Sequence, residues 1–403
     1  MSLDALLLAG GLVAPSPPIA GEAPLRVQTI VDANEFAALK DEWSSLLEKS
    51  SSNSLFVSWE WLHTWWNHLR GDAKLALVTV RRDHELVAIA PFVSHGADLF
   101  GSPTLSFLGE GRVGSDYLDV IVRHGAEDDA IPAIAEQLRR TGATLRMSQL
   151  RITSSAGSLL ARELRLSGCP VRAIRTHRCP YIDLSAGSFE AYLRTLGSEH
   201  RYNFQRKLRR LESHHSLRFE RVSTESRRVE LLPVLFELHR QRWSERGGSD
   251  GLVGAEILEF HDELTRLALQ RGWLRLFVLW LGDTPAATLY GFRYGHIFSF
   301  YQSGFDPRFA KLSVGLVALG LAIQDAIEDG ASEFDLLHGE EPYKFHWAKA
   351  ARRLGRVHAF PNRPLGRVSW AMRGAADWAR RGARRLLRRS AVTAVAPPVR
   401  ASS

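Results

Sequence analysis

Hydrophobic residues in the second half of the chain form three short runs separated by turn residues. The runs cover residues 274–281, 286–294 and 297–303, and they are rich in aromatic and β-branched side chains. Residues 282–285 separate the first two runs, and Gly295-His296 separates the second from the third. Runs of this length with short polar connections are typical of strands. The pattern therefore predicts an antiparallel meander of three strands.

A longer apolar segment follows the meander. After a loop at 304–308 that contains glycine and proline, residues 314–329 are apolar on nearly every face, and a glycine follows them. Ser313 is a suitable N-cap for such a helix. A helix that is apolar all round is buried, so we expect it to pack between the sheet and another layer. Residues 333–337 then read as a short strand whose end delivers a polar cluster at 338–344.

The first half of the chain shows the same order of elements as the second half, namely helix, strand, turn and strand. The corresponding segments are 59–69, 75–81, 82–84 and 85–93 in the first half, and 257–270, 274–281, 282–285 and 286–294 in the second. Gly168, Pro170 and Pro180 mark a break between the halves. The predicted organisation is a leader, an N-terminal domain, a C-terminal domain and a basic tail, at residues 1–24, 25–180, 181–362 and 363–403.

Composition limits the class of protein. The chain has 403 residues, of which 45% are hydrophobic and 24% charged, as in globular proteins of two ordinary domains. No apolar run reaches the ~20 residues that cross a bilayer. Cys169 and Cys179 form no C-x-x-C pair and predict no disulfide framework. The apolar residues 5–14 lack a preceding cation, so we expect a cytoplasmic protein.

The net charge of +8 is concentrated at the C-terminal end. Nine arginines lie between Arg363 and Arg389 against the single acidic residue Asp377, so the rest of the chain is close to neutral. Tryptophans and aliphatic residues stand among these arginines at roughly helical spacing. Two interpretations stay open: a basic amphipathic helix that contacts the inner face of an anionic membrane, or a helix that packs its tryptophans on the body of the protein.

The turn before the apolar helix carries a second kind of signal. It places the backbone N–H groups of Ser313, Val314 and Gly315 at a helix N-terminus, with Arg308 and Lys311 close by in sequence. N–H groups and cations at such a position can hold a diphosphate. These five residues are the candidates for binding a cofactor.

The order of three strands, loop, helix and strand resembles the acyl-CoA-binding half of the GNAT acyltransferases. The segment FDLLHGEEPYKFHWA resembles more narrowly the domain of bacterial cellulose-biosynthesis acetyltransferases, which are relatives of the Fem-type peptidoglycan aminoacyltransferases. The segments WEWLHTWW, SDYLD and HRYNFQRKLRRL extend the resemblance over roughly residues 26–360. One motif departs from the family, because Ala310 and Ser313 stand where a GNAT loop ending at Gly315 usually has Arg or Gln and Gly.

The resemblance implies an α/β (α+β) fold of two tandem GNAT-like domains with mixed, mostly antiparallel sheets flanked by helices, plus a basic C-terminal helix. It implies an N- or O-acyltransferase of bacterial exopolysaccharide or cell-envelope metabolism. Acetyl-CoA or another acyl-CoA would be the co-substrate, with no metal. Direct transfer needs a base and a donor to the oxyanion. We expect His338 or Glu340 to act as the base, Tyr343 to supply a hydroxyl group, and Lys344, by the resemblance, to stabilise the oxyanion or a phosphate.

Further candidates line an acceptor groove that the N-terminal domain would shape. Asp116 and Tyr117 lie with Asp119 where a loop enters a strand, and an aspartate there can also merely cap a turn. The remaining candidates match segments of the family: Arg201, Asn203 and Arg206 in a basic helix, and Arg242 and Trp243 after an amphipathic run. A basic helix can equally be a solvated face, and a tryptophan can be part of the core. We expect the four tryptophans of residues 59–66 to form a core seam between the domains.

Other readings compete with the leading one. The cluster His338, Glu340, Glu341 and His346 lacks a recurrent zinc spacing, so we expect no metal there. A Fem-type transfer from aminoacyl-tRNA would use the same basic helix. A non-catalytic scaffold of a membrane polysaccharide synthase would explain the altered loop before Gly315. The acceptor, an amine or hydroxyl on a sugar or envelope precursor, stays open.

Overall fold

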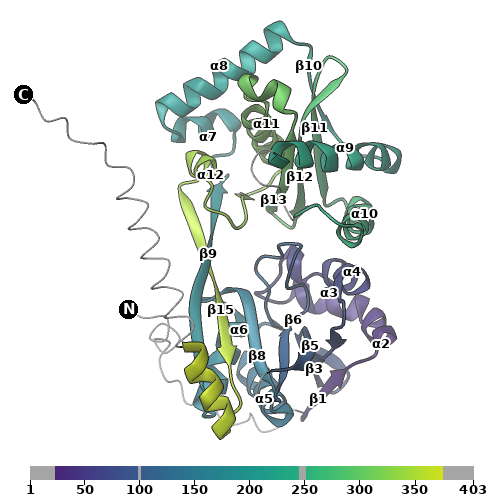
Figure 1. The fold of residues 1–403 in the computed structure, drawn as a ribbon, viewed down its shortest axis with the longest axis vertical. Coiled ribbons are helices and arrows are strands. Elements are labelled where there is room, and N and C mark those ends of the chain that lie inside the picture. Colours follow the sequence, from purple (N-terminus) through teal and green to yellow (C-terminus); the bar gives the residue numbers. More distant parts are fainter. Residues whose placement is uncertain (1–22, 99–100, 245–250, 375–403) are drawn as a thin grey trace, which may run out of the picture.

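The computed structural model describes residues 23–98, 101–244 and 251–374. Most of the predicted leader, and the tail beyond residue 374, lie outside the described residues. Figure 1 shows two lobes connected by two long strands, with the N-terminal half of the chain in one lobe and most of the C-terminal half in the other. The predicted class is confirmed, since helices flank mixed and mostly antiparallel sheets.

The first lobe is formed by the N-terminal part of the chain. Its elements are β1 (Leu25–Ile30), α2 (Ala33–Ala38), α3 (Lys40–Glu48), α4 (Trp59–Leu69), β2 (Lys74–Leu75), β3 (Leu77–Arg82), β4 (Glu85–Ala90), β5 (Phe92–Ala97), β6 (Pro103–Phe107), β7 (Ile121–Val122), α5 (Glu127–Thr141), β8 (Thr144–Arg151), α6 (Ala156–Leu166) and β9 (Val171–Asp183).

The second lobe follows, and one strand then returns to the first. The elements are α7 (Phe189–Thr195), α8 (Ser198–His214), β10 (Leu217–Arg221), α9 (Glu225–Ser244), α10 (Ala255–Gln270), β11 (Leu274–Leu281), β12 (Thr284–Tyr294), β13 (Ile297–Phe305), a 3-10 turn (Pro307–Leu312), α11 (Val314–Glu328), β14 (Glu333–Asp335), α12 (Pro342–Trp347) and β15 (Ala350–Ala359). Residues 364–374 are helical.

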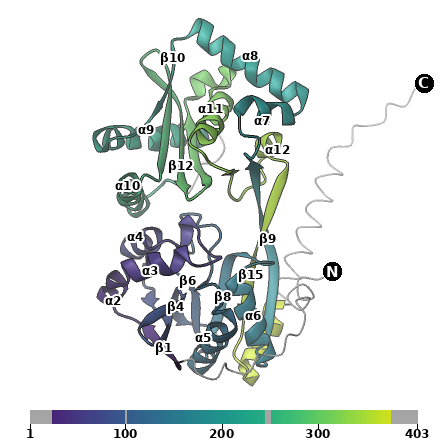
Figure 2. The same ribbon diagram turned by 180° about the vertical axis from the view of Figure 1, so that it is seen from behind.

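The strands of the described residues form two sheets. The smaller has the order β1-β3-β4-β7, and the larger has the order β10-β11-β12-β13-β14-β9-β15-β8-β6-β5-β2. Strand β15 inserts between β9 and β8, and β9 also pairs with β14. The larger sheet therefore runs through both lobes, as the long strands in Figure 2 show. The predicted boundary at 180/181 falls inside β9, and β15 lies beside strands of the first lobe.

The predicted meander is present as β11, β12 and β13, with antiparallel pairing throughout. Helices cover both of its faces. On one face α11 packs its apolar side chains against Leu289 and Phe298, while on the other face the ring of His261 in α10 lies 5.7 Å from that of Tyr290. Because the side chains of neighbouring residues in a strand point to opposite faces, Leu289 and Tyr290 can pack against the helices on the two faces of the sheet.

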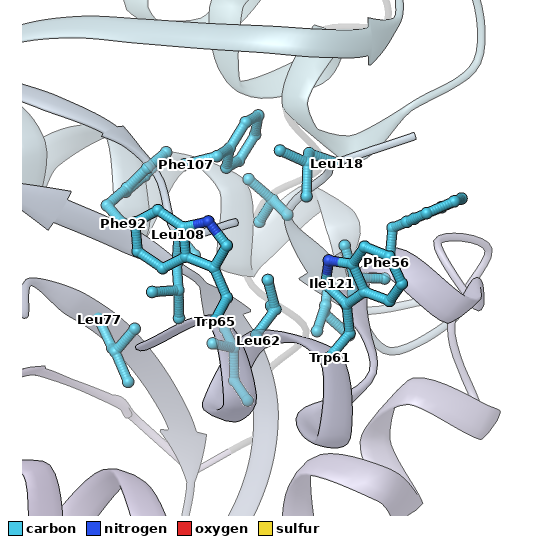
Figure 3. Packing of buried hydrophobic residues seen from close by; sticks show 14 of the residues in the cluster. Phe56, Trp61, Leu62, Trp65, Leu77, Phe92, Phe107, Leu108, Leu118 and Ile121 are labelled. Carbon is cyan, nitrogen blue, oxygen red and sulfur yellow. The ribbon is translucent and has the colours of Figure 1, made fainter. Parts of the chain in front are cut away.

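Of the four tryptophans of α4 predicted to lie between the lobes, Trp61 contacts the second lobe. Trp61 is fully buried and its ring lies 5.5 Å from that of Phe260 and 5.6 Å from that of Tyr301, both in the second lobe. Figure 3 shows Trp61 beside Phe56, and Trp65 among the side chains of the first lobe. The Trp61 indole N–H also donates to Ser115 Oγ at 2.9 Å. Helix α4 therefore fixes the loop that carries Asp116.

Candidate functional site

A gap opens between β13 and β14 in the middle of the larger sheet. The two strands pair in parallel only between Ile297–Ser299 and Glu333–Asp335. Strand β14 then ends, while β13 continues to Phe305. In addition, the register of β13 against β12 shifts beside Tyr290, which leaves Tyr301 as an extra residue in β13. Within the described residues, the backbone of β13 after Ser299 thus has no neighbouring strand on this side.

Two cavities lie along this gap. The first has a volume of about 240 Å³ and is bordered by the end of α9, by β13 and by residues 336–344. The second has a volume of about 170 Å³ and reaches Gly315 and Leu316 at the start of α11. Four residues line both of them: Arg242, Phe300, Ser303 and Tyr343. The cavities are therefore neighbours that share a wall, one on the side of α11 and the other on the side of residues 336–344.

His338 lines the first cavity and is held by Asp116 from the other lobe. The ring Nδ1 lies 2.9 Å from Asp116 Oδ1, and the backbone N–H of His338 donates to Oδ2 at 2.8 Å. Asp116 is fully buried, whereas 37% of the His338 side chain is exposed. The hydrogen bond to Asp116 raises the pKa of His338 above its usual value, although burial opposes the shift. The carboxylate also fixes the tautomer in which Nδ1 carries the proton and Nε2 can act as a base.

The loop around Asp116 is fixed on both sides. Gln149 Nε2 donates to Asp116 Oδ1 at 3.1 Å. Tyr117 has a left-handed backbone with a φ of 55°, so its side chain turns away, and its hydroxyl donates to Asp335 Oδ2 at 2.6 Å. Tyr117 lines a third cavity, of about 410 Å³, and neither of the two cavities described above. Asp116 and Tyr117 are neighbours in sequence, but Asp116 contacts His338 whereas Tyr117 contacts Asp335.

Lys344 is buried at the start of α12 and lines the first cavity. Its Nζ donates to the backbone carbonyl of His338 at 2.8 Å and lies 3.1 Å from Glu341 Oε2. Gly339, with a φ of +131°, lets these side chains approach, because a Cβ there would lie 2.6 Å from Nζ. Lys344 thus ties the turn that presents His338, and its charge is balanced by Glu341.

Tyr343 and Arg242 stand where the two cavities meet. The centre of the Arg242 guanidinium lies 6.0 Å from the centre of the Tyr343 ring and 5.3 Å from that of Trp243. Its Nη1 donates to Ser303 Oγ at 2.5 Å. Burial raises the pKa of Tyr343, and the charge of Arg242 partly opposes this. The predicted pair Arg242 and Trp243 therefore lines the first cavity together with His338.

The candidates for holding a diphosphate lie at the other end of the gap. Ser313 occupies the N-cap position of α11, as predicted. However, its backbone is left-handed, with a φ of 60°, and its side chain makes no capping hydrogen bond. Within the described residues, the N–H groups of Val314 and Gly315 make no backbone hydrogen bond. Lys311 is exposed, and its carbonyl oxygen lies 3.4 Å from Lys207 Nζ of α8. Arg308 is exposed and paired with Asp306 at 2.6 Å, so its charge is already balanced.

Several predicted residues lie outside the two cavities. Glu340 is exposed and does not line them, whereas its neighbour Glu341 lines the first. Arg201, Asn203 and Arg206 lie on α8, which packs against α11 through Phe204 and Gly320. Arg206 there donates to Asn203 Oδ1 at 3.2 Å.

Sequence reasoning missed Glu341 as a partner of Lys344, although the spacing of three residues in a helical turn could have indicated it. It also missed Gln149 and Ser303, for which the sequence gives no local signal. In the described part of the chain, no group of three His, Cys, Asp or Glu side chains is placed to hold a metal ion. None of the helices there is long and apolar enough to cross a bilayer.

Comparisons with known proteins agree with this geometry. Residues 198–345 match the family model described as an acetyltransferase (GNAT) domain. No curated protein matches the chain in sequence. Residues 198–345 are therefore similar to a GNAT-type acetyltransferase domain, and the fold is GNAT-like.

Solved structures share this fold at low sequence identity. FemX superposes with a TM-score of 0.60 and 10% identity, over 86% of this chain and 100% of FemX. The C-terminal domain of a putative lysylphosphatidylglycerol synthetase from Agrobacterium fabrum gives a TM-score of 0.51 and 13% identity, over 80% of this chain and 92% of that domain. Identities this low indicate a shared fold and leave the substrates open.

Proposed function

We propose that the protein is an acyl-CoA-dependent N- or O-acyltransferase whose two substrates meet in the gap between β13 and β14. The observation that carries the proposal is the pair of neighbouring cavities. One reaches the N-terminus of α11, and the other is lined by His338, which the buried Asp116 holds from behind. A thioester can enter from the side of α11, and an acceptor can enter from the side of His338.

The donor side fits the diphosphate end of an acyl-CoA. The N–H groups of Val314 and Gly315 lie at the positive end of the α11 dipole, where anions are stabilised. A Cβ at Gly315 would contact only Phe305, at 3.5 Å, so the space beside the helix start is open. Lys311 and Lys207 supply positive charge near this end. Backbone groups of β13 that lack a partner strand can then hold the arm of the cofactor.

The acceptor side fits general-base catalysis. In the reaction, the amine nitrogen or hydroxyl oxygen of the acceptor bonds to the thioester carbon, the C–S bond breaks, and CoA leaves as a thiolate that takes up a proton. Nε2 of His338 accepts the proton that the acceptor loses, while Asp116 stabilises the resulting imidazolium. Lys344 keeps the His338 turn in place through the carbonyl of His338.

The biological setting rests on the resemblance to bacterial cellulose-biosynthesis acetyltransferases. We infer a role in exopolysaccharide or cell-envelope metabolism, with a sugar or envelope precursor as acceptor. Residues 364–374 expose Leu365, Val368 and Met372 beside arginines, which supports peripheral contact with an anionic membrane. Cosedimentation with anionic vesicles, lost on deletion from Pro364 onward, tests this contact.

A Fem-type transfer from aminoacyl-tRNA is the second candidate, favoured by the superposition on FemX. The two candidates differ in their donor. Transfer that is abolished by ribonuclease and unaffected by acyl-CoA would replace the first candidate with the second.

The first test is calorimetric titration with acetyl-CoA and with free CoA. We expect saturable binding that Lys311→Ala weakens, because that substitution removes a positive charge beside α11. Lys344→Ala should keep most of the binding while lowering acyl transfer by about 10²-fold, since the turn that positions His338 loses its anchor. Arg240→Ala, on the exposed face of α9 and paired with Glu237, is the matched control. Absence of acyl-CoA binding by the wild-type protein would refute the proposal.

A further inference from the structure

Arg242 carries a positive charge that no carboxylate balances within the described residues. Its Nη1 donates to the hydroxyl and backbone carbonyl of Ser303, at 2.5 and 3.4 Å. Its Nε is buried and has no hydrogen-bond partner. The guanidinium also lies within 6.0 Å of the ring centres of Trp243, Phe305 and Tyr343. A cation partly enclosed by aromatic rings is favourable, but its remaining donor needs an acceptor.

The position of Arg242 indicates that a bound substrate supplies this hydrogen-bond acceptor. It is one of the four residues that line both cavities. A thioester carbonyl that is attacked from the side of His338 must lie where the cavities meet, because the donor occupies one cavity and the acceptor the other. The negative charge that develops on the carbonyl oxygen during attack thus arises beside the guanidinium.

Two other cations near the cavities are already paired with carboxylates. Lys344 lies 3.1 Å from Glu341 and donates to the carbonyl of His338. Arg308 pairs with Asp306. An unbalanced cation stabilises a developing anion more than a balanced one does, particularly where water is excluded.

We propose that Arg242 is a catalytic residue that stabilises the oxyanion formed when the acceptor attacks the acyl carbonyl. This proposal rests on the acyltransferase function and takes the role first predicted for Lys344. As the acceptor lone pair bonds to the carbonyl carbon, the π electrons move to the oxygen, which then accepts hydrogen bonds from Arg242. Collapse of this intermediate returns the electrons and expels the CoA thiolate. Ser303 holds the guanidinium in place for this step.

The test measures CoA release from acetyl-CoA with hydroxylamine as a small nucleophile in place of the unidentified acceptor. Arg242→Gln should lower kcat by about 10²- to 10³-fold while changing the KM for acetyl-CoA less than about threefold, because the charge acts only in the transition state. Arg242→Lys should give an intermediate rate. Guanidinium ion at millimolar concentration should restore part of the rate of Arg242→Ala and leave the wild type unchanged.

Arg240→Gln on the same helix is the matched control, since Arg240 is exposed and paired with Glu237. Thermal unfolding of each variant shows whether it folds. If Arg242→Gln and Arg242→Ala do not fold, Arg242→Lys, which keeps the charge, remains to test the proposal. A kcat for Arg242→Gln or Arg242→Lys equal to the wild-type value would overturn the proposal. So would a folded Arg242→Ala variant that guanidinium ion does not rescue.

Failure of the underlying function gives a different result. If the wild-type protein neither binds acetyl-CoA by calorimetry nor releases CoA, the acyltransferase proposal fails and this role of Arg242 fails with it. If binding and release are normal and only the Arg242 variants are unaffected, the acyltransferase proposal stands and the role of Arg242 alone is refuted.

Discussion

Replacing Asp116 with asparagine tests how the two lobes build the site. The carboxylate accepts hydrogen bonds from the His338 ring, the His338 backbone and Gln149. An asparagine has one acceptor oxygen and one amide group in place of the two acceptor oxygens. If the amide group faces the ring, Nδ1 must accept, so that Nε2 carries the proton and cannot act as a base. If the amide group faces the backbone instead, its N–H group and the backbone N–H of His338 are two donors that face each other without an acceptor.

The expected magnitude follows from these contacts. A charge-assisted hydrogen bond contributes about 1.5–3 kcal/mol, and a positioned general base accelerates a reaction about 10²- to 10⁴-fold. Because Asp116→Asn keeps the shape of the side chain but removes the correct tautomer, we expect kcat to fall about 10²- to 10³-fold. Binding of acyl-CoA at α11 should stay unchanged, because Asp116 does not line the cavity that reaches this helix.

Two measurements check this expectation. The first is CoA release with hydroxylamine as a function of pH. The rate depends on neutral His338, whose pKa is raised chiefly by the hydrogen bond to Asp116, so the wild-type rate should increase as the pH rises through this raised pKa. In Asp116→Asn the pKa of His338 should fall, and the acid limb of the profile should move to lower pH. The second measurement is the NMR titration of the His338 ring, assigned with His338→Gln, which needs no acceptor.

An unchanged His338 titration in Asp116→Asn, together with wild-type kcat, would refute the reasoning. A lower rate without a shift of the titration would also contradict it, because the contact would then serve only the stability of the loop. Glu340→Gln is the control, since this carboxylate is exposed and outside the cavity.

Two further predictions concern stability. Gly304→Ala should lower the free energy of unfolding by about 3 kcal/mol, because its Cβ would lie 2.3 Å from the backbone nitrogen of His239 in α9; a melting temperature equal to that of the wild type would contradict this. Tyr117→Phe removes a donor from Asp335, whose pKa burial raises to about 6. The folded protein holds the Asp335 proton between pH 4 and 6 more firmly than the unfolded chain does, so ionisation of Asp335 costs stability as the pH rises. The loss of melting temperature in Tyr117→Phe should therefore be greater at pH 8 than at pH 5, and equal losses would disprove the role of the contact.

Several local elements in both halves of the chain could be predicted from the sequence. The strand at 274–281 and the helix at 59–69 have the predicted bounds, and the apolar helix differs by one residue at its end. These segments are specified by their own periodicity and by glycine or proline at their ends, which act over a few residues. The burial of Trp61 between the lobes followed from the same reasoning.

The assembly of the site could not be predicted in the same way. Asp116 and His338 are 222 residues apart, and their hydrogen bond depends on how the lobes pack. The choice between Glu340 and Glu341 depends on the backbone turn at Gly339, which directs one carboxylate to Lys344 and leaves the other in solvent. Sequence patterns show which residues are polar, but the side to which each one points depends on tertiary structure.

The insertion of β15 between β9 and β8 has a consequence for synthesis of the chain. Without β15, the larger sheet would consist of two separate sheets, with β9 and β8 each exposing an unpaired edge. The ribosome releases this strand only after residues 184–349 have been made, so β8 and β9 keep these unpaired edges while that segment is synthesised. Unpaired edges promote association with other chains, so the nascent protein is most exposed to aggregation during this interval. The same delay means that Asp116 and His338 are fixed relative to each other only after β15 has been made.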